Sequence, residues 1–236
     1  MANLKGQIAM VTGASRGIGR DIAWRLAQTE CDLILLARSG DELSALAMEI
    51  KTAGREAMPI AVDMRDETQI HAAVDKALTY FGRIDIVVNN AGLYRYALVQ
   101  DLSLDDWDEM FDVNLRGTFL VTKYVLPSML ARGRGHFVNM CSVWGLIGDT
   151  ESAGYCATKW GVRGFSQSLF KEVGPRGIRV TLIDPGLVNN SNDDTSEDRA
   201  LIQNADIADV VLTAVMMPAR TTLYEAVLWQ TADEYP

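Results

Sequence analysis

A tyrosine that can exchange a proton with a bound oxygen atom lies four positions before a lysine that can assist it. Tyr155 and Lys159 lie in the segment YCATK, which begins a stretch with helical apolar spacing. Residues four apart share one face of a helix, and an ammonium group beside a phenol favours the phenolate form. Tyr155 could then act as a general acid and base near neutral pH. Taken alone, the pair would also suit an ordinary amphipathic helix with an exposed lysine.

A third polar group, the hydroxyl of Ser142, precedes Tyr155 by 13 positions. It could hydrogen-bond the same oxygen as the charge on that oxygen changes. The surrounding segment MCSVW lacks the G-x-S-x-G pattern of a hydrolase nucleophile, and neither of the two histidines lies in a recognised motif. A serine hydrolase is therefore not favoured.

A glycine-rich turn lies between the first apolar run and the helical pattern that starts at Arg20. It is the segment TGASRGIG, from Thr12 to Gly19. Glycines let a backbone approach a pyrophosphate closely, and the free amides at a helix start stabilise its charge. The spacing is G-x-x-x-G-x-G instead of the commoner G-x-G-x-x-G, so by itself it could be a plain strand-to-helix connection.

The elements that must position these residues alternate along the chain. Short runs rich in Val, Ile and Leu alternate with longer segments of 3.6-residue apolar period, which predicts an α/β fold with a parallel sheet and helices on both faces. A helix is expected from Asp66, and another from Ser103, which Asp106 can help to cap and whose last turn Pro127 should bend or shorten. Seven strands are expected, at 7–12, 32–37, 57–62, 84–89, 135–141, 179–184 and 223–228.

Most of the polar motifs follow the ends of these strands. Asn89 to Gly92 (NNAG) follows the fourth strand, Ser142 the fifth, and Pro185 with Gly186 the sixth. The carboxyl ends of parallel strands meet at one edge of the sheet, so one crevice could hold these motifs with the glycine turn and the Tyr155 helix.

Composition limits the classes of function. The 236 residues favour one large domain spanning 1–236, and 48% hydrophobic with 22% charged residues excludes disorder and collagen. A net charge of −9 disfavours nucleic-acid and membrane-surface partners, and no apolar stretch resembles a spanning helix or signal segment. We expect a cytoplasmic protein. Cys31, Cys141 and Cys156 have no metal-site spacing, so we expect buried thiols and no metal.

With these residues the sequence resembles the short-chain dehydrogenase/reductase family, in its single-domain form, over Leu4 to Leu228. The resemblance implies a Rossmann-type doubly wound sheet of order 3-2-1-4-5-6-7 and hydride transfer between a nicotinamide and a carbonyl or alcohol. The family's catalytic residues match Asn114, Ser142, Tyr155 and Lys159. Asn114 would interrupt its helix and hold a water that links Lys159 to solvent. The residues implied for cofactor binding are Gly13, Ser15, Arg16, Gly17, Ile18, Gly19, Arg38, Asp63, Asn90, Ala91, Gly92, Tyr155, Lys159, Pro185, Gly186 and Val188.

The end of the second strand indicates which nicotinamide cofactor is used. An acidic residue there would bind the adenosine ribose of NAD, but the chain has Ala37 and Arg38. Arg38 and Arg16 could bind the 2′-phosphate of NADP(H), although two surface arginines are the alternative. Asp63 resembles the family's adenine-contacting aspartate, with a solvated helix cap as the alternative.

The substrate is less well indicated. The resemblance implies a pocket formed by Tyr94, Trp144, Leu146 and Leu187, with Tyr96 nearby, although such residues can equally be core. A substrate loop is expected over 186–206, which includes the polar segment 189–199 that could be a solvated loop, a ligand lid or both. Asn190 replaces a threonine that the family often uses at the nicotinamide carboxamide.

Together these observations predict an NADP(H)-dependent oxidoreductase acting on a small ketone, secondary alcohol or hydroxy acid. The chain lacks the late Asp-Gly-Gly typical of 3-oxoacyl-carrier-protein reductases, so reduction of a 3-oxoacyl thioester is the alternative. A second alternative is a dinucleotide-binding sensor without turnover. The helices from Ser103 and Tyr155 are expected, by resemblance, to form a homodimer or homotetramer.

Overall fold

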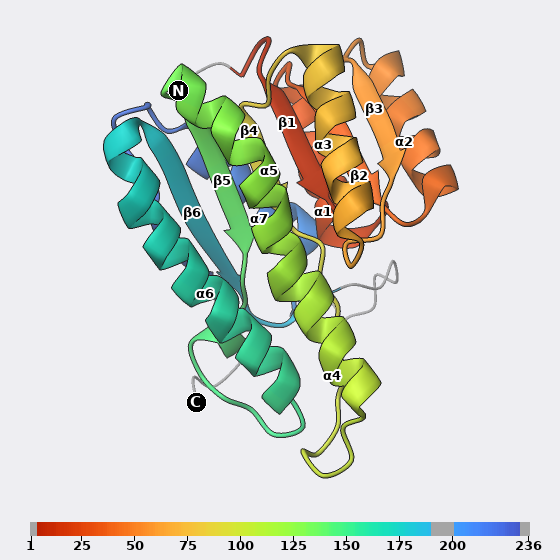
Figure 1. Ribbon diagram of the computed structural model, residues 1–236, viewed down its shortest axis with the longest axis vertical. Helices are drawn as coiled ribbons and strands as arrows, with labels where there is room; N and C mark the ends of the chain where they lie inside the picture. Colours follow the sequence, from red (N-terminus) through yellow and green to blue (C-terminus); the bar gives the residue numbers. More distant parts are fainter. Residues whose placement is uncertain (1–3, 190–200, 232–236) are drawn as a thin grey trace.

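Seven parallel strands form one sheet in the computed structural model, which describes residues 4–189 and 201–231 (Figure 1). The strand order, β3-β2-β1-β4-β5-β6-β9, confirms the predicted seven strands and the Rossmann-type arrangement. All neighbouring pairs are parallel. The strands are β1 (Ile8–Thr12), β2 (Asp32–Ala37), β3 (Ala57–Ala61), β4 (Ile86–Asn89), β5 (Gly135–Met140), β6 (Ile178–Pro185) and β9 (Glu225–Leu228).

Helices cover both faces of the sheet. One hydrophobic cluster joins α1, α2 and α7 to one face, and a second joins α3, α5 and α6 to the other. Successive β1 residues point to opposite faces: Ala9 and Val11 enter the first cluster, and Ile8 and Met10 the second. Burial on both faces explains the continuous apolar strands. The helices are α1 (Gly17–Gln28), α2 (Gly40–Thr52), α3 (Glu67–Phe81), α4 (Leu104–Met110), α5 (Gly117–Arg132), α6 (Ala153–Val173) and α7 (Asn204–Met216).

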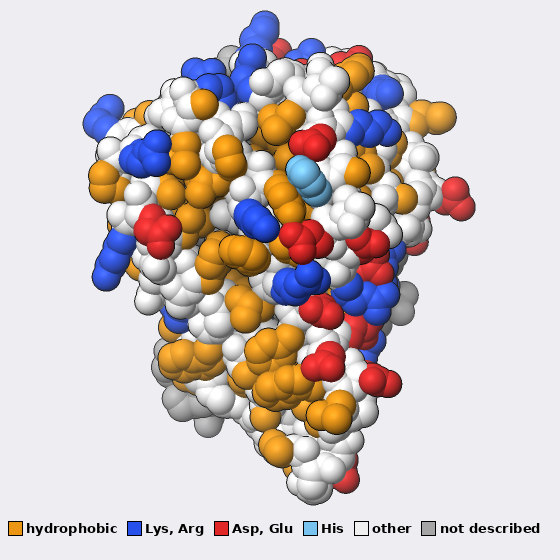
Figure 2. Space-filling view, in the orientation of Figure 1, with side chains coloured by type: hydrophobic (Ala, Val, Ile, Leu, Met, Phe, Trp, Pro, Cys, Tyr) orange, Lys and Arg blue, Asp and Glu red, His pale blue; other side chains and the backbone are white. Residues whose placement is uncertain are grey.

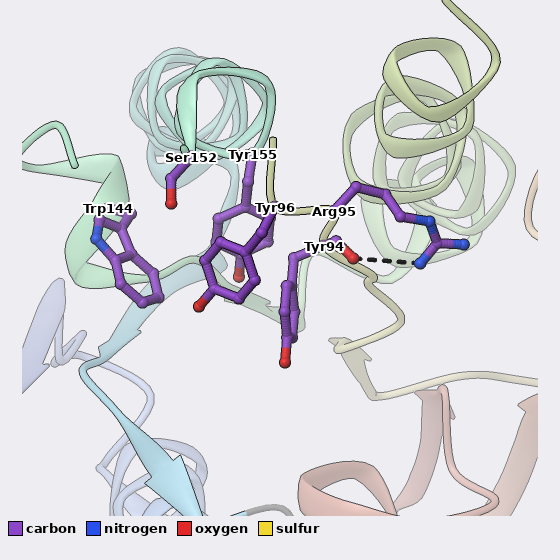
Figure 3. A pocket seen from close by; sticks show the side chains of 6 residues that line it. All are labelled: Tyr94, Arg95, Tyr96, Trp144, Ser152 and Tyr155. Carbon is purple, nitrogen blue, oxygen red and sulfur yellow. Dashed lines mark hydrogen bonds between the residues drawn. The ribbon is translucent and has the colours of Figure 1, made fainter. Parts of the chain in front are cut away.

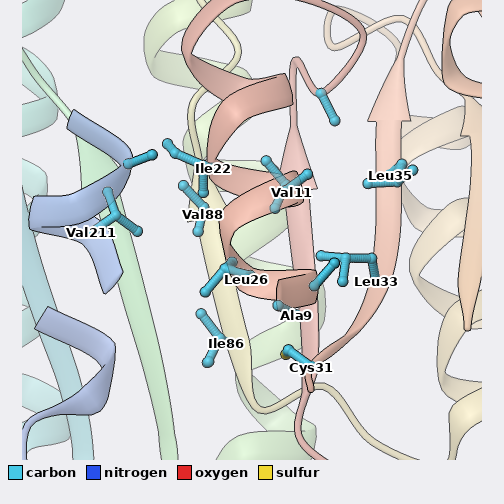
Figure 4. Packing of buried hydrophobic residues seen from close by; sticks show 14 of the residues in the cluster. Ala9, Val11, Ile22, Leu26, Cys31, Leu33, Leu35, Ile86, Val88 and Val211 are labelled. Carbon is cyan, nitrogen blue, oxygen red and sulfur yellow. The ribbon is translucent and has the colours of Figure 1, made fainter. Parts of the chain in front are cut away.

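Figure 4 shows the first cluster around β1, where α1 and α7 contact the sheet. Ile22 and Leu26 of α1 are fully buried with Val211 of α7 against Val11 and Val88. This packing fixes the start of α1, and therefore the glycine turn before it, relative to β1.

Two helix starts have the caps that the sequence indicates. The Asp66 side chain accepts from the backbone nitrogen of Gln69 before α3, and the Ser103 hydroxyl accepts from that of Asp106 before α4. A π-helical turn, η1 (Phe111–Arg116), joins α4 to α5.

The sequence left open whether Pro127 bends or shortens its helix; the structure shows that it does not end the helix, because α5 continues to Arg132. Proline removes only one backbone donor. Arg132 stabilises the last turn by donating to the Ser128 carbonyl at 3.2 Å and to the Asp85 carboxylate at 2.6 Å.

A pair of two-residue strands, β7 (Val188–Asn189) and β8 (Ile202–Gln203), is a feature that the sequence pattern did not predict. Two 3₁₀ turns complete the described elements, η2 (Val143–Gly145) and η3 (Gly174–Arg176). The three cysteines are buried and free. None of the helices in the described ranges has both the length and the apolar character needed to cross a membrane.

Candidate active site

Tyr155 and Lys159 lie on consecutive turns at the start of α6, as the sequence predicts. The Nζ atom of Lys159 is 5.4 Å from the centre of the Tyr155 ring. It donates to the backbone oxygen of Met140, at the end of β5, at 3.0 Å, and the side chain is almost fully buried. The lysine therefore holds this face of α6 against the end of β5.

Asn114 lies inside the π-helical turn η1, so the long helix is interrupted where the resemblance implies. Its side-chain oxygen accepts from the Leu93 nitrogen at 2.9 Å, and its Nδ2 donates to the Leu93 oxygen at 2.8 Å and to the Thr158 hydroxyl at 3.1 Å. A Cβ on Gly92 would lie 3.4 Å from Asn114 Oδ1 and 3.7 Å from Lys159 Nζ. Asn114 thus joins the loop after β4 to α6.

Ser142 follows β5 and begins the turn η2. Its hydroxyl donates to the Pro185 oxygen at 3.4 Å and accepts from the Trp144 nitrogen at 3.3 Å. Trp144 in turn lies with its ring 6.1 Å from the ring of Tyr155. The turn that carries Ser142 therefore faces the start of α6 on one side and the end of β6 on the other.

The glycine turn has the backbone that a pyrophosphate site needs. Gly13 and Gly17 have φ of +66° and +55°, which side chains rarely tolerate. A Cβ on Gly19 would collide with the Gly13 carbonyl. No side chain among the described residues caps α1, which begins at Gly17, so its first amides can bind an anion. These features fit a dinucleotide cofactor.

The NNAG segment is bonded directly to this turn. The hydroxyl of Thr12 accepts from the backbone nitrogens of Asn90 and Ala91 at 3.0 and 2.9 Å. The Asn90 side chain donates to the Thr12 oxygen at 3.0 Å. The loops after β1 and β4 are therefore one rigid unit.

Arg16 and Arg38 follow the ends of the neighbouring strands β1 and β2, and both are exposed. The glycine turn contacts the end of β2, because the Ala14 nitrogen donates to the Leu36 oxygen at 3.1 Å. Within the described ranges neither arginine forms an ion pair, whereas many other arginines do, such as Arg20 with Glu49 at 2.7 Å. Both guanidinium groups are thus available to an anion at this edge.

Asp63 does not cap α3, because Asp66 does. Arg65, which sequence analysis did not single out, donates from Nε and Nη2 to both oxygens of the Asp63 carboxylate, at 3.0 and 2.6 Å. This hydrogen bonding lowers the pKa of Asp63. Any adenine contact by Asp63 would therefore come from a carboxylate that Arg65 already holds.

A small pocket surrounds Tyr155 and is lined by aromatic rings (Figure 3). Tyr94 and Trp144 each lie 6.1 Å from the Tyr155 ring, and Tyr94 is 4.9 Å from Tyr96. Arg95 also lines the pocket, but its guanidinium points away from the rings in Figure 3. It pairs with Asp106 and Glu109 at 3.0 and 2.7 Å. Ser152 completes the lining, which does not include the expected Leu146 and Leu187.

The segment after β6 is described as far as Asn189. The Gly186 nitrogen donates to the Leu228 oxygen at 2.8 Å, and the Leu187 nitrogen to Gln230 Oε1 at 3.2 Å. These bonds fix Pro185 and Gly186 beside Ser142. Asn190 and most of the expected substrate loop lie outside the described residues.

Sequence analysis also missed Arg163, a buried side chain on the same helix face as Tyr155 and Lys159. The signal that could have found it is the repeated four-residue spacing of Tyr155, Lys159 and Arg163.

The chain is similar to known proteins in sequence and in fold. A family model described as short chain dehydrogenase matches residues 7–200. An uncharacterized oxidoreductase of Staphylococcus epidermidis is 34% identical over 230 residues, which cover 97% of this chain and 99% of that protein. The 3-oxoacyl-[acyl-carrier-protein] reductase FabG of Aquifex aeolicus is 40% identical over 186 residues, which cover 78% of this chain and 75% of that one.

Two solved structures are also similar over nearly the whole chain. A metagenomic short-chain oxidoreductase in complex with NADP has a TM-score of 0.88 at 33% identity, covering 98% of this chain and 100% of that one. An alcohol dehydrogenase from Thermococcus sibiricus, complexed with 5-hydroxy-NADP, has a TM-score of 0.92 at 29% identity, covering 98% and 99%.

Proposed function

The chain belongs to the short-chain dehydrogenase family, and from this premise we propose that it is an NADP(H)-dependent oxidoreductase for small apolar ketones and the matching secondary alcohols. The observation that carries the proposal is one assembly at the carboxyl edge of the sheet. Tyr155, Lys159 and Asn114 are joined there to the Ser142 turn and lie beside a glycine cradle shaped for a dinucleotide.

In this proposal the loops after β1, β2, β3, β4 and β6 would each hold one part of the cofactor. The amides at the start of α1 bind the pyrophosphate, and the NNAG segment and the β6 end flank the remainder. Bound in this way, the nicotinamide supplies the hydride or accepts it. The proposed binding residues are Gly13, Ser15, Arg16, Gly17, Ile18, Gly19, Arg38, Asp63, Asn90, Ala91, Gly92, Pro185, Gly186 and Val188, with Tyr155 and Lys159.

The side chains around the substrate oxygen donate a proton to it or accept one from it. In ketone reduction the Tyr155 hydroxyl gives its proton to the oxygen, and in alcohol oxidation the phenolate takes it back. The Ser142 hydroxyl, by turning its one proton away from the Pro185 oxygen, hydrogen-bonds the same substrate oxygen while its charge changes. The ammonium of Lys159 stabilises the phenolate, and Asn114 keeps α6 aligned with the loop after β4.

A preference for NADP(H) is supported by charge. Ala37 stands where a carboxylate would select the ribose of NAD, and Arg16 and Arg38 are two exposed cations at the same edge. Two similar solved structures are complexes with NADP and with 5-hydroxy-NADP.

The pocket supports an apolar substrate with a flat group beside the carbonyl. Three aromatic rings surround Tyr155, and the one cation in the described lining, Arg95, is bound by two carboxylates. A carboxylate substrate would therefore meet no free positive charge in that lining, which disfavours hydroxy acids. A 3-oxoacyl thioester is the alternative substrate, since FabG of Aquifex aeolicus is 40% identical over 186 residues, and the missing late Asp-Gly-Gly motif is what disfavours it.

We also propose that the protein forms a homo-oligomer through the face formed by α4, α5 and α6. Figure 2 shows hydrophobic side chains gathered over this face, and Leu104, Trp107, Phe119 and Trp160 are exposed there. A groove on the same face also carries Asp112 and Arg116. Asp112 and Arg116 already pair with each other at 4.0 Å, so a second copy related by a two-fold axis would mainly cover the rings. A cytoplasmic location remains a prediction.

The deciding experiment follows NADPH absorbance with four substrates: acetophenone, cyclohexyl methyl ketone, acetoacetate and an acetoacetyl thioester. We expect turnover with the two uncharged ketones, faster with the aryl ketone. Preference for the thioester or for acetoacetate would contradict the proposed substrate class. NADPH binding without turnover of any ketone or alcohol would instead support the sensor.

A further inference from the structure

Arg163 lies one helical turn after Lys159 and two turns after Tyr155, on the same face of α6. The residue is only 7% exposed. No role has been assigned to it above. With Tyr155 and Lys159 it forms a line of side chains along one face of α6 that continues into the interior. A buried guanidinium needs acceptors for its donors, so its partners show what it does.

Three partners come from three different elements. Nε donates to the backbone oxygen of Gly145 at 2.7 Å, in the turn η2 that follows Ser142. Nη2 donates to Asp184 Oδ1 at 2.6 Å, in β6 directly before Pro185, and Nη1 to Glu225 Oε1 at 2.6 Å, in β9. One side chain of the Tyr155 helix thus binds the turn and both strands beside it.

The turn that Arg163 holds is also the turn that sets Ser142. The Gly145 nitrogen donates to the Ser142 oxygen at 2.8 Å, and the Ser142 hydroxyl reaches the Pro185 oxygen at 3.4 Å. The fit is close, since a Cβ on Gly145 would lie 3.1 Å from the Lys159 oxygen. A shift of the guanidinium would therefore move Ser142 relative to Tyr155 and Lys159.

A buried ion pair is by itself weak evidence of stabilisation, because desolvation offsets the attraction. The geometry of the group is more informative. Guanidinium is a planar fork whose donors point in fixed directions, so Arg163 can satisfy three acceptors at once, whereas an ammonium is a compact charge on a flexible stem.

We propose that Arg163 is a positioning residue that holds the Ser142 turn and the end of β6 in the register in which Ser142, Tyr155 and Lys159 reach one substrate oxygen. This inference rests on the proposed function, since it assigns Arg163 a part in that reaction. The competing explanation is that Arg163 only neutralises the buried carboxylate of Asp184.

The first test uses Arg163→Lys, which keeps the charge beside Asp184 and removes the fork. We expect kcat to fall about 10-fold or more, because small displacements of reacting groups are costly. The Kd of NADPH, measured by fluorescence without turnover, should stay within about 3-fold. Amide hydrogen exchange over residues 143–147 should become faster, because the turn loses its anchor.

The matched control is Arg179→Lys. Arg179 is also a largely buried arginine of the sheet region, but it lies at the opposite end of β6 and donates to the backbone oxygens of Ala214, Val215 and Met217. This variant should keep kcat within about 2-fold.

If Arg163→Lys does not fold, the double variant Arg163→Met/Asp184→Asn removes both buried charges and should show the same loss of kcat. The proposal is overturned if a folded variant keeps kcat within 2-fold of wild type, or if amide exchange over residues 143–147 is unchanged. It is also overturned if kcat and NADPH affinity fall equally, or if both variants fail to fold. If the wild type turns over no ketone or alcohol, the proposed function fails, and hydrogen exchange alone then decides whether Arg163 anchors the turn.

Discussion

The Nζ atom of Lys159 lies 5.4 Å from the centre of the Tyr155 ring while it donates to the backbone oxygen of Met140 at 3.0 Å. The four-residue spacing on the helix sets the distance between Lys159 and the Tyr155 ring. The hydrogen bond to Met140 fixes the lysine against the end of β5. The cation is thus held beside the phenol by the protein's own contacts, which makes the phenol the group to test first.

Removing the Tyr155 hydroxyl should abolish most turnover. Tyr155→Phe keeps the ring that packs near Tyr94 and Trp144, so the fold and NADPH binding should be preserved. We expect kcat to fall by about 10²- to 10⁴-fold, the range usual for loss of a general acid. Steady-state kinetics with acetophenone and a fluorescence titration with NADPH would measure both effects. Near-normal turnover would exclude Tyr155 as the proton donor.

Cofactor preference should depend on Arg38 and Ala37. Arg38→Ala should raise the KM for NADPH about 10-fold or more and leave that for NADH nearly unchanged, because one charge-assisted contact to the 2′-phosphate is lost. Ala37→Asp should shift the preference toward NADH, since the carboxylate repels that phosphate and can accept from the ribose. Arg20→Ala, which breaks a surface pair with Glu49, is the control. Equal wild-type efficiency with both cofactors would contradict the argument.

Substitution by alanine should destabilise the protein at Gly19 and stabilise it at Gly164. Gly19→Ala places a Cβ against the Gly13 carbonyl and should weaken NADPH binding at least about 10-fold and lower the melting temperature. Gly164→Ala, in the exposed middle of α6 with no atom within 4 Å of the added Cβ, should raise the unfolding free energy by about 1 kcal/mol. Thermal melts and NADPH titration compare the two. Normal NADPH affinity in Gly19→Ala would exclude this cradle as the binding site.

Acid should destabilise the fold through His136. Burial, with a smaller effect of Arg179, lowers the pKa of His136 well below its ordinary 6.5. Its Nε2 lies 2.8 Å from the Thr181 hydroxyl, and Nδ1 has no partner among the described residues. Below pH 6.5 the unfolded chain takes up a proton that the folded protein excludes, so the unfolding free energy should fall by up to about 1.4 kcal/mol per pH unit.

The comparison of His136→Gln with wild type isolates this effect. Glutamine can still donate to Thr181, and the acid dependence below pH 6.5 should become shallower in urea titrations. Asp184 acts in the opposite direction: burial raises its pKa to about 6, so the folded protein gains a proton before the unfolded chain does, but this contribution is common to both proteins. An unchanged acid slope in His136→Gln would contradict this origin of the acid sensitivity.

Association should depend on the apolar face of α4, α5 and α6. Phe119→Asp combined with Trp160→Asp puts charge on two exposed rings and should give a 26.0 kDa particle by light scattering, whereas the wild type should give a multiple of that mass. Tyr80→Asp, which changes an exposed ring on α3, is the control. A wild type of 26.0 kDa at micromolar concentration would contradict the oligomer.

The sequence allowed prediction of those features whose signal lies within one short segment. The central strands of the sheet are continuous apolar runs because both of their faces are covered, and such runs are visible in the sequence. Asp66 and Ser103 mark helix starts by spacing alone. The four residues proposed as catalytic were identified from the motifs around them, and their role stays a prediction. Their burial and hydrogen bonds required the folded chain.

Features that depend on distant partners could not be predicted in the same way. The partners of Arg163 lie 18, 21 and 62 residues away, and its spacing alone would equally suit a surface arginine. The strands β7 and β8 are two residues each, too short for a periodic pattern. Arg65 is close to Asp63 in sequence, but only the turn between them brings its guanidinium onto the carboxylate.

The π-helical turn at Phe111–Arg116 makes the site sensitive to chain length as well as to residue identity. A π turn holds one more residue than an α turn, so loss of one residue there would restore α geometry and remove the wide turn. Asn114 would then lose the backbone that directs its side chain to Leu93 and Thr158, while α4 and α5 would keep nearly the same relative rotation. Single-residue deletions in this segment should therefore be tolerated far less than substitutions at its exposed positions.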